Sequence, residues 1–428
     1  MYMDGITSCD TRPSSDSRSM EPGKPKALVV TGEFPYPPDH GARVDIWRRV
    51  QVLAGLGFSV EVLATVFRPP EPGELAAVRS VVDDVILVSR RHNLTGVFSR
   101  APGQVSTRGQ LRQARMNASY DLVVLETEAV ASVLDNPHLR AKVVALRIQN
   151  DEPRYYQDLA RSERNWLKRA YYATEARRFR RLLPLIHARV DRFWFISLEE
   201  RDAFAAAVGL PSAANAYFLP APLDPNGFRP HPAGGASVLF VGTLSHPVNV
   251  EALCWYLHHV HPRLQSLPGY HLVIAGNTRG TRVEWLRRRV EELGHVELHE
   301  NPNAKALYAL YALSSVFVNP AHSGAGVKVK TINAIEAGLP VVCTTVGKQG
   351  TGLRASVDVN VEDQPAAFAE AIRRLLGDPA RRRSVVAEAQ RFLAINYDHQ
   401  EIIRASLKDA GLASSSLAEH GEVTSLSG

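Results

Sequence analysis

Short runs of Val, Ile and Leu alternate with helix-like stretches along almost the whole chain, and this alternation limits the fold more than any other feature. Continuous apolar strands are typical of parallel sheets that are covered by helices on both faces. Such runs lie in the first half at residues 27–31, 60–64, 85–89, 122–126, 143–148 and 193–197, and in the second half at 238–242, 272–276, 296–299, 316–320 and 341–345. The sequence therefore predicts an α/β protein with two doubly wound domains.

Length and local composition predict where the domains divide. A chain of 428 residues is too long for one ordinary core, which rarely grows beyond roughly 250–300 residues. The Pro- and Gly-rich stretch from Tyr217 to Ala236 has no periodicity and is typical of a linker. We expect a first domain at 26–216, a linker at 217–236 and a second domain at 237–396. We also expect a C-terminal helix at 397–412 that returns to the first domain, and disordered tails at 1–25 and 413–428.

Composition indicates a globular enzyme of a reducing compartment. The hydrophobic content is 45%, and no run approaches the roughly 18 apolar residues that a membrane span requires. The polar N-terminal stretch lacks the apolar segment of a secretory signal. Cys9, Cys254 and Cys343 lie far apart and match no metal-binding or redox spacing. We expect a cytoplasmic protein, with any membrane contact peripheral and on the inner face.

Positive charge is concentrated in one segment. The net charge is +6, but residues 161–192 hold ten Lys and Arg side chains and are predicted to form a basic helix. Tyr172, Ala176, Phe179, Leu183 and Ile186 follow helical spacing along it. This helix could present a solvated outer face, or it could contact an anionic membrane surface as a partner. No aromatic platform or known reader motif accompanies the charge, so nucleic acid is not an expected partner.

The segment from Ser323 to Val342 is predicted to form a glycine loop that opens a helix directly after a buried strand. Gly324 and Gly326 give the loop backbone freedom, and Gly338 with Pro340 ends the helix. The amide groups and dipole at a helix start favour an anion, and Lys328 and Lys330 add positive charge. This arrangement is typical of a diphosphate site.

A second loop of this kind, Gly32 to Gly41, follows the first predicted strand and precedes a helix with Ile46, Val50 and Leu53 on one face. Ligands of open parallel sheets bind beyond the carboxyl ends of the strands. We therefore expect both loops to lie at the mouth of a cleft. Either loop taken alone could have a purely structural role.

Several segments together resemble one enzyme family. They are FPYPPDHGARVDIWRRVQVLAGLGFSVEVL, EARRFRRLLPLIHARVDRFWFISLEERDAF, PAPLDPNGFRP, VLFVGTLSHPVNVEALCWYL and SGAGVKVKTINAIEAGLPVVCTT. The chain resembles retaining glycosyltransferases of the GT-B fold, in the group 1 type that makes cell-wall and exopolysaccharide glycans. The resemblance implies two Rossmann-like domains that face each other across a cleft. It also implies transfer of a sugar from a nucleotide sugar to a glycan or lipid-linked acceptor with retention of configuration, without a metal or other cofactor.

The resemblance assigns the donor-binding residues one by one. Gly242 and Thr243 match the turn beside the diphosphate, and His299 with Glu300 matches the turn that frames the base. Two family glutamates are replaced by Ala325 and Asn333, so a lysine is expected to supply donor contacts and Asn333 to accept a ribose hydroxyl. Glu336 is not regarded as a replacement. The expected donor contacts are Gly41, Gly242, Thr243, His299, Ser323, Gly324, Ala325, Gly326, Val327, Lys328, Lys330 and Asn333.

Catalytic residues are harder to assign, because a retaining transfer of this type needs charge stabilisation more than a dedicated nucleophile. The candidates are His40, Asp151 and Lys330. His40 could equally be an exposed loop residue, Asp151 could cap the next helix, and Asn249 in the SHPVN segment could also be a cap. Further polar candidates at the cleft are Asp39, Arg43 and Glu126.

Two alternative functions remain open at this point. A nucleotide-sugar epimerase shares the two-domain form, and a catalytically silent binding protein could keep the fold. The Pro-rich first loop and the GAGVKVK segment favour the transferase. Isomerisation of the donor without acceptor would identify the epimerase.

Overall fold

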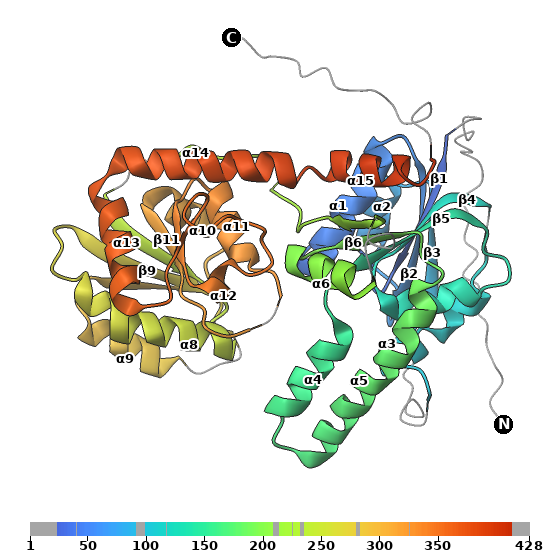
Figure 1. Cartoon of the computed structure of the whole chain (residues 1–428), viewed down its shortest axis with the longest axis horizontal. Helices are drawn as coiled ribbons and strands as arrows, with labels where there is room; N and C mark the ends of the chain where they lie inside the picture. The colour runs from blue at the N-terminus through green and yellow to red at the C-terminus, as the bar shows by residue number, and fades with distance from the viewer. Residues whose placement is uncertain are drawn as a thin grey trace, which may run out of the picture.

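The computed structural model describes residues 24–39, 41–90, 99–116, 118–208, 214–224, 226–231, 235–279, 283–324 and 326–412. The chain forms two α/β units, each built on a parallel sheet, and Figure 1 shows them side by side. His40, Ala325 and nearly all of the two expected tails lie outside the described residues.

The first sheet has seven parallel strands in the order β3-β2-β1-β4-β5-β6-β7. Val29, Val62 and Val124 enter one buried apolar cluster, while Leu28 and Leu63 enter another. Both faces of the sheet are therefore apolar, as a doubly wound sheet requires. The strands are β1 (Lys26–Thr31), β2 (Ser59–Val66), β3 (Asp84–Ser89), β4 (Tyr120–Leu125), β5 (Ala141–Ile148), β6 (Arg192–Phe195) and β7 (Ala216–Phe218).

Helices of the first unit connect these strands. Ile46, Val50 and Leu53 of α1 are buried, as the sequence predicted. The α-helices are α1 (Gly41–Gly55), α2 (Pro72–Arg79), α3 (Gly103–Ser106), α4 (Glu152–Ser162), α5 (Trp166–His187) and α6 (Leu198–Val208), and the 3-10 helices are η2 (Gly109–Gln113) and η3 (Glu128–Asp135).

The second sheet has six parallel strands in the order β10-β9-β8-β11-β12-β13. Its strands are β8 (Ala236–Val241), β9 (Tyr270–Gly276), β10 (Val296–Glu300), β11 (Val316–Asn319), β12 (Val341–Cys343) and β13 (Asn360–Val361). The helical elements are α8 (Pro247–Trp255), η4 (Tyr256–Val260), η5 (His261–Arg263), α9 (Glu284–Glu292), α10 (Ala304–Leu313), α11 (Val329–Glu336), α12 (Thr345–Lys348) and α13 (Pro365–Gly377). The predicted α/β architecture of two parallel sheets is confirmed.

Two C-terminal helices connect the units. Figure 1 shows α14 (Pro379–Asn396) extending from the second unit toward the first, where α15 (His399–Lys408) lies against α1. Ile403 and Leu407 of α15 are buried in the first core, and Trp194 Nε1 donates to Ser406 Oγ at 2.9 Å. The last helix therefore completes the core of the first unit.

The predicted single basic helix at 161–192 is wrong in its extent. α4 ends at Ser162 and a separate helix, α5, begins at Trp166. The break arises because the Asn165 side chain accepts from the amides of Leu167 and Lys168 and so caps a new helix. The apolar stripe lies on the inner side of α5 as predicted, since Ala176, Phe179 and Ile186 are buried and Tyr172 and Leu183 are partly buried.

Two short strands were not predicted. β7 occupies Ala216–Phe218, so its last two residues fall in the segment expected to be linker, and β13 has only two residues. Such short strands carry too few apolar residues to be recognised as a run. Across the described ranges, no helix is both long enough and apolar enough to span a bilayer.

Candidate functional site

A cavity of about 540 Å³ lies at the carboxyl edge of the second sheet, where ligands of such sheets bind. It is formed by the ends of β8, β9 and β10 and by the start of α11. The lining residues are Val241, Gly242, Thr243, Asn249, Gly276, Asn277, Arg279, Asn301, Pro302, Leu307, Val327, Lys328, Val329 and Lys330. Of the predicted donor residues, Gly242, Thr243, Val327, Lys328 and Lys330 are therefore brought together.

The turn after β8 is closely packed against the end of β9. A Cβ atom placed on Gly276 would lie 1.9 Å from the Gly242 carbonyl oxygen, and the Leu244 amide donates to the Asn277 carbonyl at 2.8 Å. Glycine is therefore required at position 276, because any side chain would displace the turn. The sequence predicted the strand that ends at Gly276 but assigned no site role to Gly276 or Asn277.

Lys330 is held at the wall of the cavity by Asn249. The Lys330 ammonium donates to Asn249 Oδ1 at 2.7 Å, while Asn249 Nδ2 donates to the Thr243 carbonyl at 3.0 Å. The interpretation of Asn249 as a helix cap is wrong, because His246 occupies the cap position of α8 and Asn249 lies inside the helix. Asn249 instead links the glycine turn to the lysine.

The electrostatic environment of Lys330 favours the binding of an anion beside its ammonium group. Burial lowers the pKa of Lys330 to about 8, and the neighbouring charge of Lys328 acts in the same direction. The ammonium lies 5.2 Å from the centre of the Phe240 ring. Among the described residues it forms no ion pair with a carboxylate, so a bound anion would supply the missing opposite charge.

The loop before α11 has the backbone form that the sequence predicted. Gly324 has φ +97° and Gly326 has φ +81°, and both lie in the region that favours glycine. The Lys328 ammonium donates to the carbonyls of Gly324 and Gly326 at 2.7 Å and 3.0 Å. Lys328 therefore fixes the shape of the loop while also lining the cavity.

Several predicted donor residues lie elsewhere. Ser323 donates to Glu251 Oε2 at 2.7 Å, and Asn333 is exposed on α11; neither lines the cavity, so their donor contacts stay predictions. Gly41 begins α1 in the first unit. Glu336 accepts from the Asp224 amide in the linker and lies outside this cavity.

The turn that was expected at His299 and Glu300 begins later in the chain, after Glu300. Both residues belong to β10; His299 pairs with Glu297 at 2.7 Å, and Glu300 pairs with Arg287. The cavity is lined instead by the next residues, Asn301 and Pro302. An Asn-Pro pair directly after an apolar strand is a turn signal that could have located this position.

A second cavity, of about 570 Å³, lies at the carboxyl edge of the first sheet. It is lined by Gly32, Glu33, Phe34, Ala42, Arg43, Ile46, Thr65, Val66, Phe67, Arg68, Arg90, Gln104, Arg108, Glu126, Thr127, Ala129, Gln149 and Glu152. Arg43 and Glu126 are thus at the site that the sequence proposed for them. Arg43 Nε donates to Glu33 Oε2 at 3.0 Å and Nη1 donates to Asp39 Oδ1 at 3.3 Å.

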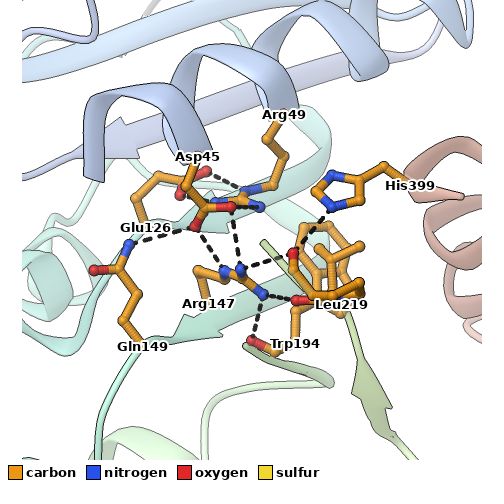
Figure 2. Close-up of polar contacts among 9 residues, drawn as sticks. Asp45, Arg49, Glu126, Arg147, Gln149, Trp194, Leu219 and His399 are labelled. Carbon is orange, nitrogen blue, oxygen red and sulfur yellow. Dashed lines mark hydrogen bonds and ion pairs between the residues drawn. The ribbon is translucent and has the colours of Figure 1, made fainter. Parts of the chain in front are cut away.

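A buried network of charged side chains lies beside the second cavity and reaches its lining through Glu126 (Figure 2). Arg49 donates to Glu126 at 2.6 Å and 2.7 Å and to Asp45 at 2.9 Å, and Arg147 donates to Asp45 at 2.9 Å and 3.1 Å. Burial alone would raise the pKa of Asp45, but Arg147 and Arg49 outweigh it and hold that pKa well below its usual range. Both carboxylate oxygens of Glu126 accept hydrogen bonds from Arg49.

The same network reaches the linker and the last helix. Arg147 donates to the carbonyls of Leu219 and Pro220, and a ring nitrogen of His399 lies 3.0 Å from the Pro220 oxygen. Figure 2 shows Arg147 between Asp45 and this stretch of the linker. The start of the linker is thereby fixed to the first unit.

The candidate carboxylate Asp151 is a helix cap. Its Oδ1 accepts from the Arg154 amide at 3.0 Å at the start of α4, and it is absent from the lining of both cavities. The neighbouring Glu152 lines the second cavity instead. Burial, with the charges of Asp151 and Glu200, raises the pKa of Glu152 to about 7. Asp151 was therefore predicted at the correct edge of the sheet, but Gln149 and Glu152 on either side of it line the cavity instead.

Two further points concern the candidate residue His40 and the side chains that could bind a metal ion. His40 lies outside the described residues, so its role stays a prediction. Within the described ranges, no three His, Cys, Asp or Glu side chains gather in a geometry that could hold a metal ion.

Comparisons with known proteins give the family. A model described as "Glycosyl transferases group 1" matches residues 235–378, which include the first cavity. The chain is 30% identical over 391 residues to an uncharacterized 44.6 kDa protein in the cps region of Klebsiella pneumoniae. The aligned region covers 90% of this chain and 99% of the relative.

Solved structures share the fold at low identity. Anabaena HepE in complex with UDP-glucose has a TM-score of 0.59 and 13% identity, covering 91% of this chain and 100% of HepE. A variant of S. aureus TarM in complex with fondaparinux, α-GlcNAc-glycerol and UDP has a TM-score of 0.58 and 7% identity, covering 91% and 100%. The chain is therefore a glycosyltransferase of the GT-B fold, with a group 1 glycosyltransferase domain at residues 235–378.

Proposed function

We propose that the chain transfers a sugar from a nucleotide sugar in the first cavity to a glycan or lipid-linked acceptor in the second cavity, with retention of configuration. The position of Lys330 carries this proposal: an ammonium group whose pKa is lowered by burial is held by Asn249 beside the Gly242 turn at the carboxyl edge of the sheet. The complexes of HepE with UDP-glucose and of TarM with UDP support a nucleotide-sugar donor. The relative from the cps region supports a role in polysaccharide biosynthesis.

The chemistry follows from charge placement. The bond between the anomeric carbon and the diphosphate oxygen breaks, and the departing diphosphate gains negative charge beside Lys330. The acceptor hydroxyl attacks the same face of the sugar and gives its proton to the leaving phosphate oxygen. Electrostatic stabilisation of the leaving group is usually the largest contribution to such catalysis. The protein binds the nucleotide sugar as a co-substrate.

Binding and product analysis test the proposal. Calorimetry with UDP, GDP and their sugars is expected to show one nucleotide bound per chain. NMR of the transfer product is expected to show the same anomeric configuration as the donor. Binding without any transfer to glycan or lipid-linked acceptors would contradict the transferase, and an inverted product would contradict retention.

We further propose that α4 and α5 bring the enzyme to the inner face of the membrane. Figure 1 shows these two helices lying together and extending away from the first sheet. Trp166 is 73% exposed and Leu167 is 59% exposed at the start of α5, and the basic side chains Arg177, Arg180 and Arg181 are exposed farther along it. Exposed aromatic and basic side chains together favour an anionic lipid surface.

Sedimentation with liposomes tests the membrane contact. Binding to vesicles with anionic lipid is expected for the native chain and is expected to fall sharply when Arg177, Arg180 and Arg181 are changed to Glu. Arg178 is left unchanged because it pairs with buried Glu175 at 2.6 Å. Arg381→Glu with Arg383→Glu reverses two exposed arginines of α14 and is the control for charge reversal on another surface. Equal binding to neutral and anionic vesicles would exclude this surface.

A further inference from the structure

Two arginines in the second cavity have no acidic partner within the part of the chain that the structure describes. Arg90 directly follows β3, and Arg108 lies between α3 and η2; both line the cavity at the carboxyl edge of the first sheet. Among the described residues, neither guanidinium forms an ion pair with a carboxylate. Buried or half-buried charges are costly without a partner of opposite sign.

Arg108 is oriented by neutral oxygen atoms. It is 7% exposed, and it donates from Nε to Thr65 Oγ1 at 3.2 Å, from Nη1 to the Gln104 carbonyl at 2.7 Å and from Nη2 to the Gly32 carbonyl at 3.0 Å. A guanidinium has five N–H donors, so each Nη keeps one more donor. Arg108 is therefore fixed in place with donors and charge remaining for a ligand.

Arg90 is held beside it by an aromatic ring. Its guanidinium carbon lies 4.4 Å from the centre of the Phe67 ring, and its buried Nε has no hydrogen-bond partner among the described residues. Burial and, to a smaller extent, the charge of Arg90 lower the pKa of Arg108 to about 10. The two positive charges are thus close enough to repel each other, and both remain charged at neutral pH.

The acidic group that acts on both arginines is already paired. Glu33 is the carboxylate whose charge acts on both arginines, and its Oε2 accepts from Arg43 Nε at 3.0 Å. Glu126, which lines the cavity, is bonded to Arg49. Glu152 also lines the cavity, and its buried Oε2 has no hydrogen-bond partner among the described residues, but burial raises its pKa to about 7 and its charge does not act on either arginine. The arginine pair therefore presents positive charge to the cavity.

We propose that Arg90 and Arg108 form an oxyanion subsite, so that the acceptor of this enzyme carries a phosphate or carboxylate group that docks against them. That the second cavity binds the acceptor rests on the proposed function, but the subsite itself is defined by the two arginines. Guanidinium groups bind phosphate and carboxylate through paired N–H donors, which matches the donors left on Arg108. The enzyme would then select acidic acceptors over neutral ones.

Direct binding tests the subsite without knowledge of the acceptor. The full chain is saturated with UDP to occupy the first cavity, and inorganic phosphate, glucuronate and neutral glucose are titrated separately by calorimetry or NMR. Phosphate or glucuronate is expected to bind more tightly than glucose. Arg90→Gln and Arg108→Gln are each expected to weaken binding of the anion about tenfold or more. A loss for phosphate alone indicates a phosphate-bearing acceptor, and a loss for glucuronate alone indicates a uronate.

The controls separate this proposal from the proposed function. Arg112→Gln removes an exposed arginine of η2 that pairs with Asp135, and it is expected to leave anion binding unchanged. Arg90 is less buried than Arg108, so Arg90→Gln is expected to melt at the native temperature even if Arg108→Gln does not. Anion binding that is unchanged in both variants, or absent from the native chain, overturns the subsite. Failure to bind any nucleotide overturns the donor function, while the variants still decide the subsite.

Discussion

Lys330 is the side chain on which donor chemistry is expected to depend. Lys330→Ala removes the ammonium beside the predicted diphosphate, and the transfer rate is expected to fall about 100- to 1000-fold, as for loss of one group that stabilises transition-state charge. The rate is measured with saturating donor and compared with urea unfolding of the same variant. Lys305→Ala, at an exposed position of α10, is the matched control. A native rate in the Lys330 variant would move the phosphate contact to another residue.

The pKa of Lys330 also predicts how donor binding depends on pH. The pKa is about 8 in the empty site, and a bound diphosphate is expected to raise it because it stabilises the charged form. Above pH 8 the free lysine is neutral, so UDP binding must take up a proton and its affinity falls as pH rises. Calorimetry from pH 7 to 9.5 measures this loss. Lys330→Arg stays charged and is expected to remove the dependence; an identical pH profile in both proteins would contradict this account.

At the scale of elements, the packing of β8 against β9 sets the shape of the donor cavity. Gly276→Ala places a methyl group into the Gly242 carbonyl, and the expected cost is about 1–3 kcal/mol of unfolding free energy together with loss of UDP affinity. Urea unfolding and calorimetry measure the two effects. Gly73→Ala is the control, because a Cβ at that position meets no atom within 4 Å. An alanine at 276 that binds UDP normally would show that the turn tolerates displacement.

The buried network joins α1, β4 and β5 through charge. Asp45→Asn leaves Arg49 and Arg147 without one of the two carboxylates that neutralise them, and the expected loss is about 3–5 kcal/mol of unfolding free energy. Asp158→Asn removes a similar carboxylate from an exposed pair with Arg161 and is expected to cost less than about 1 kcal/mol. Denaturant titration of both variants distinguishes a buried network from a surface contact. Equal losses of unfolding free energy in Asp45→Asn and Asp158→Asn would contradict the distinction between the buried network and the surface pair.

At the scale of the whole molecule, the C-terminal helix stabilises the unit from which it is most distant in sequence. Leu407 is fully buried against the first core, and Leu407→Ala is expected to cost about 2–5 kcal/mol. Hydrogen exchange should quicken in residues 26–66 and remain native in residues 236–276. Ile395→Ala, at a 70% exposed position of α14, is the control and should change neither region. Faster exchange in the second unit alone would contradict this packing.

The predictability of the elements depended on the length of each apolar run. β2 and β5 carry enough consecutive apolar residues to be recognised, whereas β7 and β13 have three and two residues and were missed. The basic segment was predicted as one helix because its charge is continuous, but the Asn165 cap divides it. Local caps and short edge strands depend on neighbours that a periodicity does not show.

The candidate sites show the same difference. Lys328 and Lys330 follow a glycine loop of recognisable composition and Gly242 was assigned by the family resemblance, so their place in one cavity was predicted. Asp45, Arg49 and Arg147 had no signal, since a charged residue on a helix or strand is ordinarily expected to face solvent. Arg90 and Arg108 were not predicted either, because each is a single basic residue in a stretch without a recognisable motif.

Hydrophobic periodicity and turn chemistry act over a few neighbouring residues, so the amino-acid sequence was enough to predict the two parallel sheets, their strand and helix succession and the glycine loop of the donor cavity. The folded chain was needed to show which charges are buried together, which residue of each turn lines a cavity, and where the last helix packs. Those outcomes depend on contacts between residues such as Arg147 and Pro220 or Trp194 and Ser406, which lie far apart along the chain. Burial removes water from such charges and makes their partners decisive, and burial is set by the assembled fold.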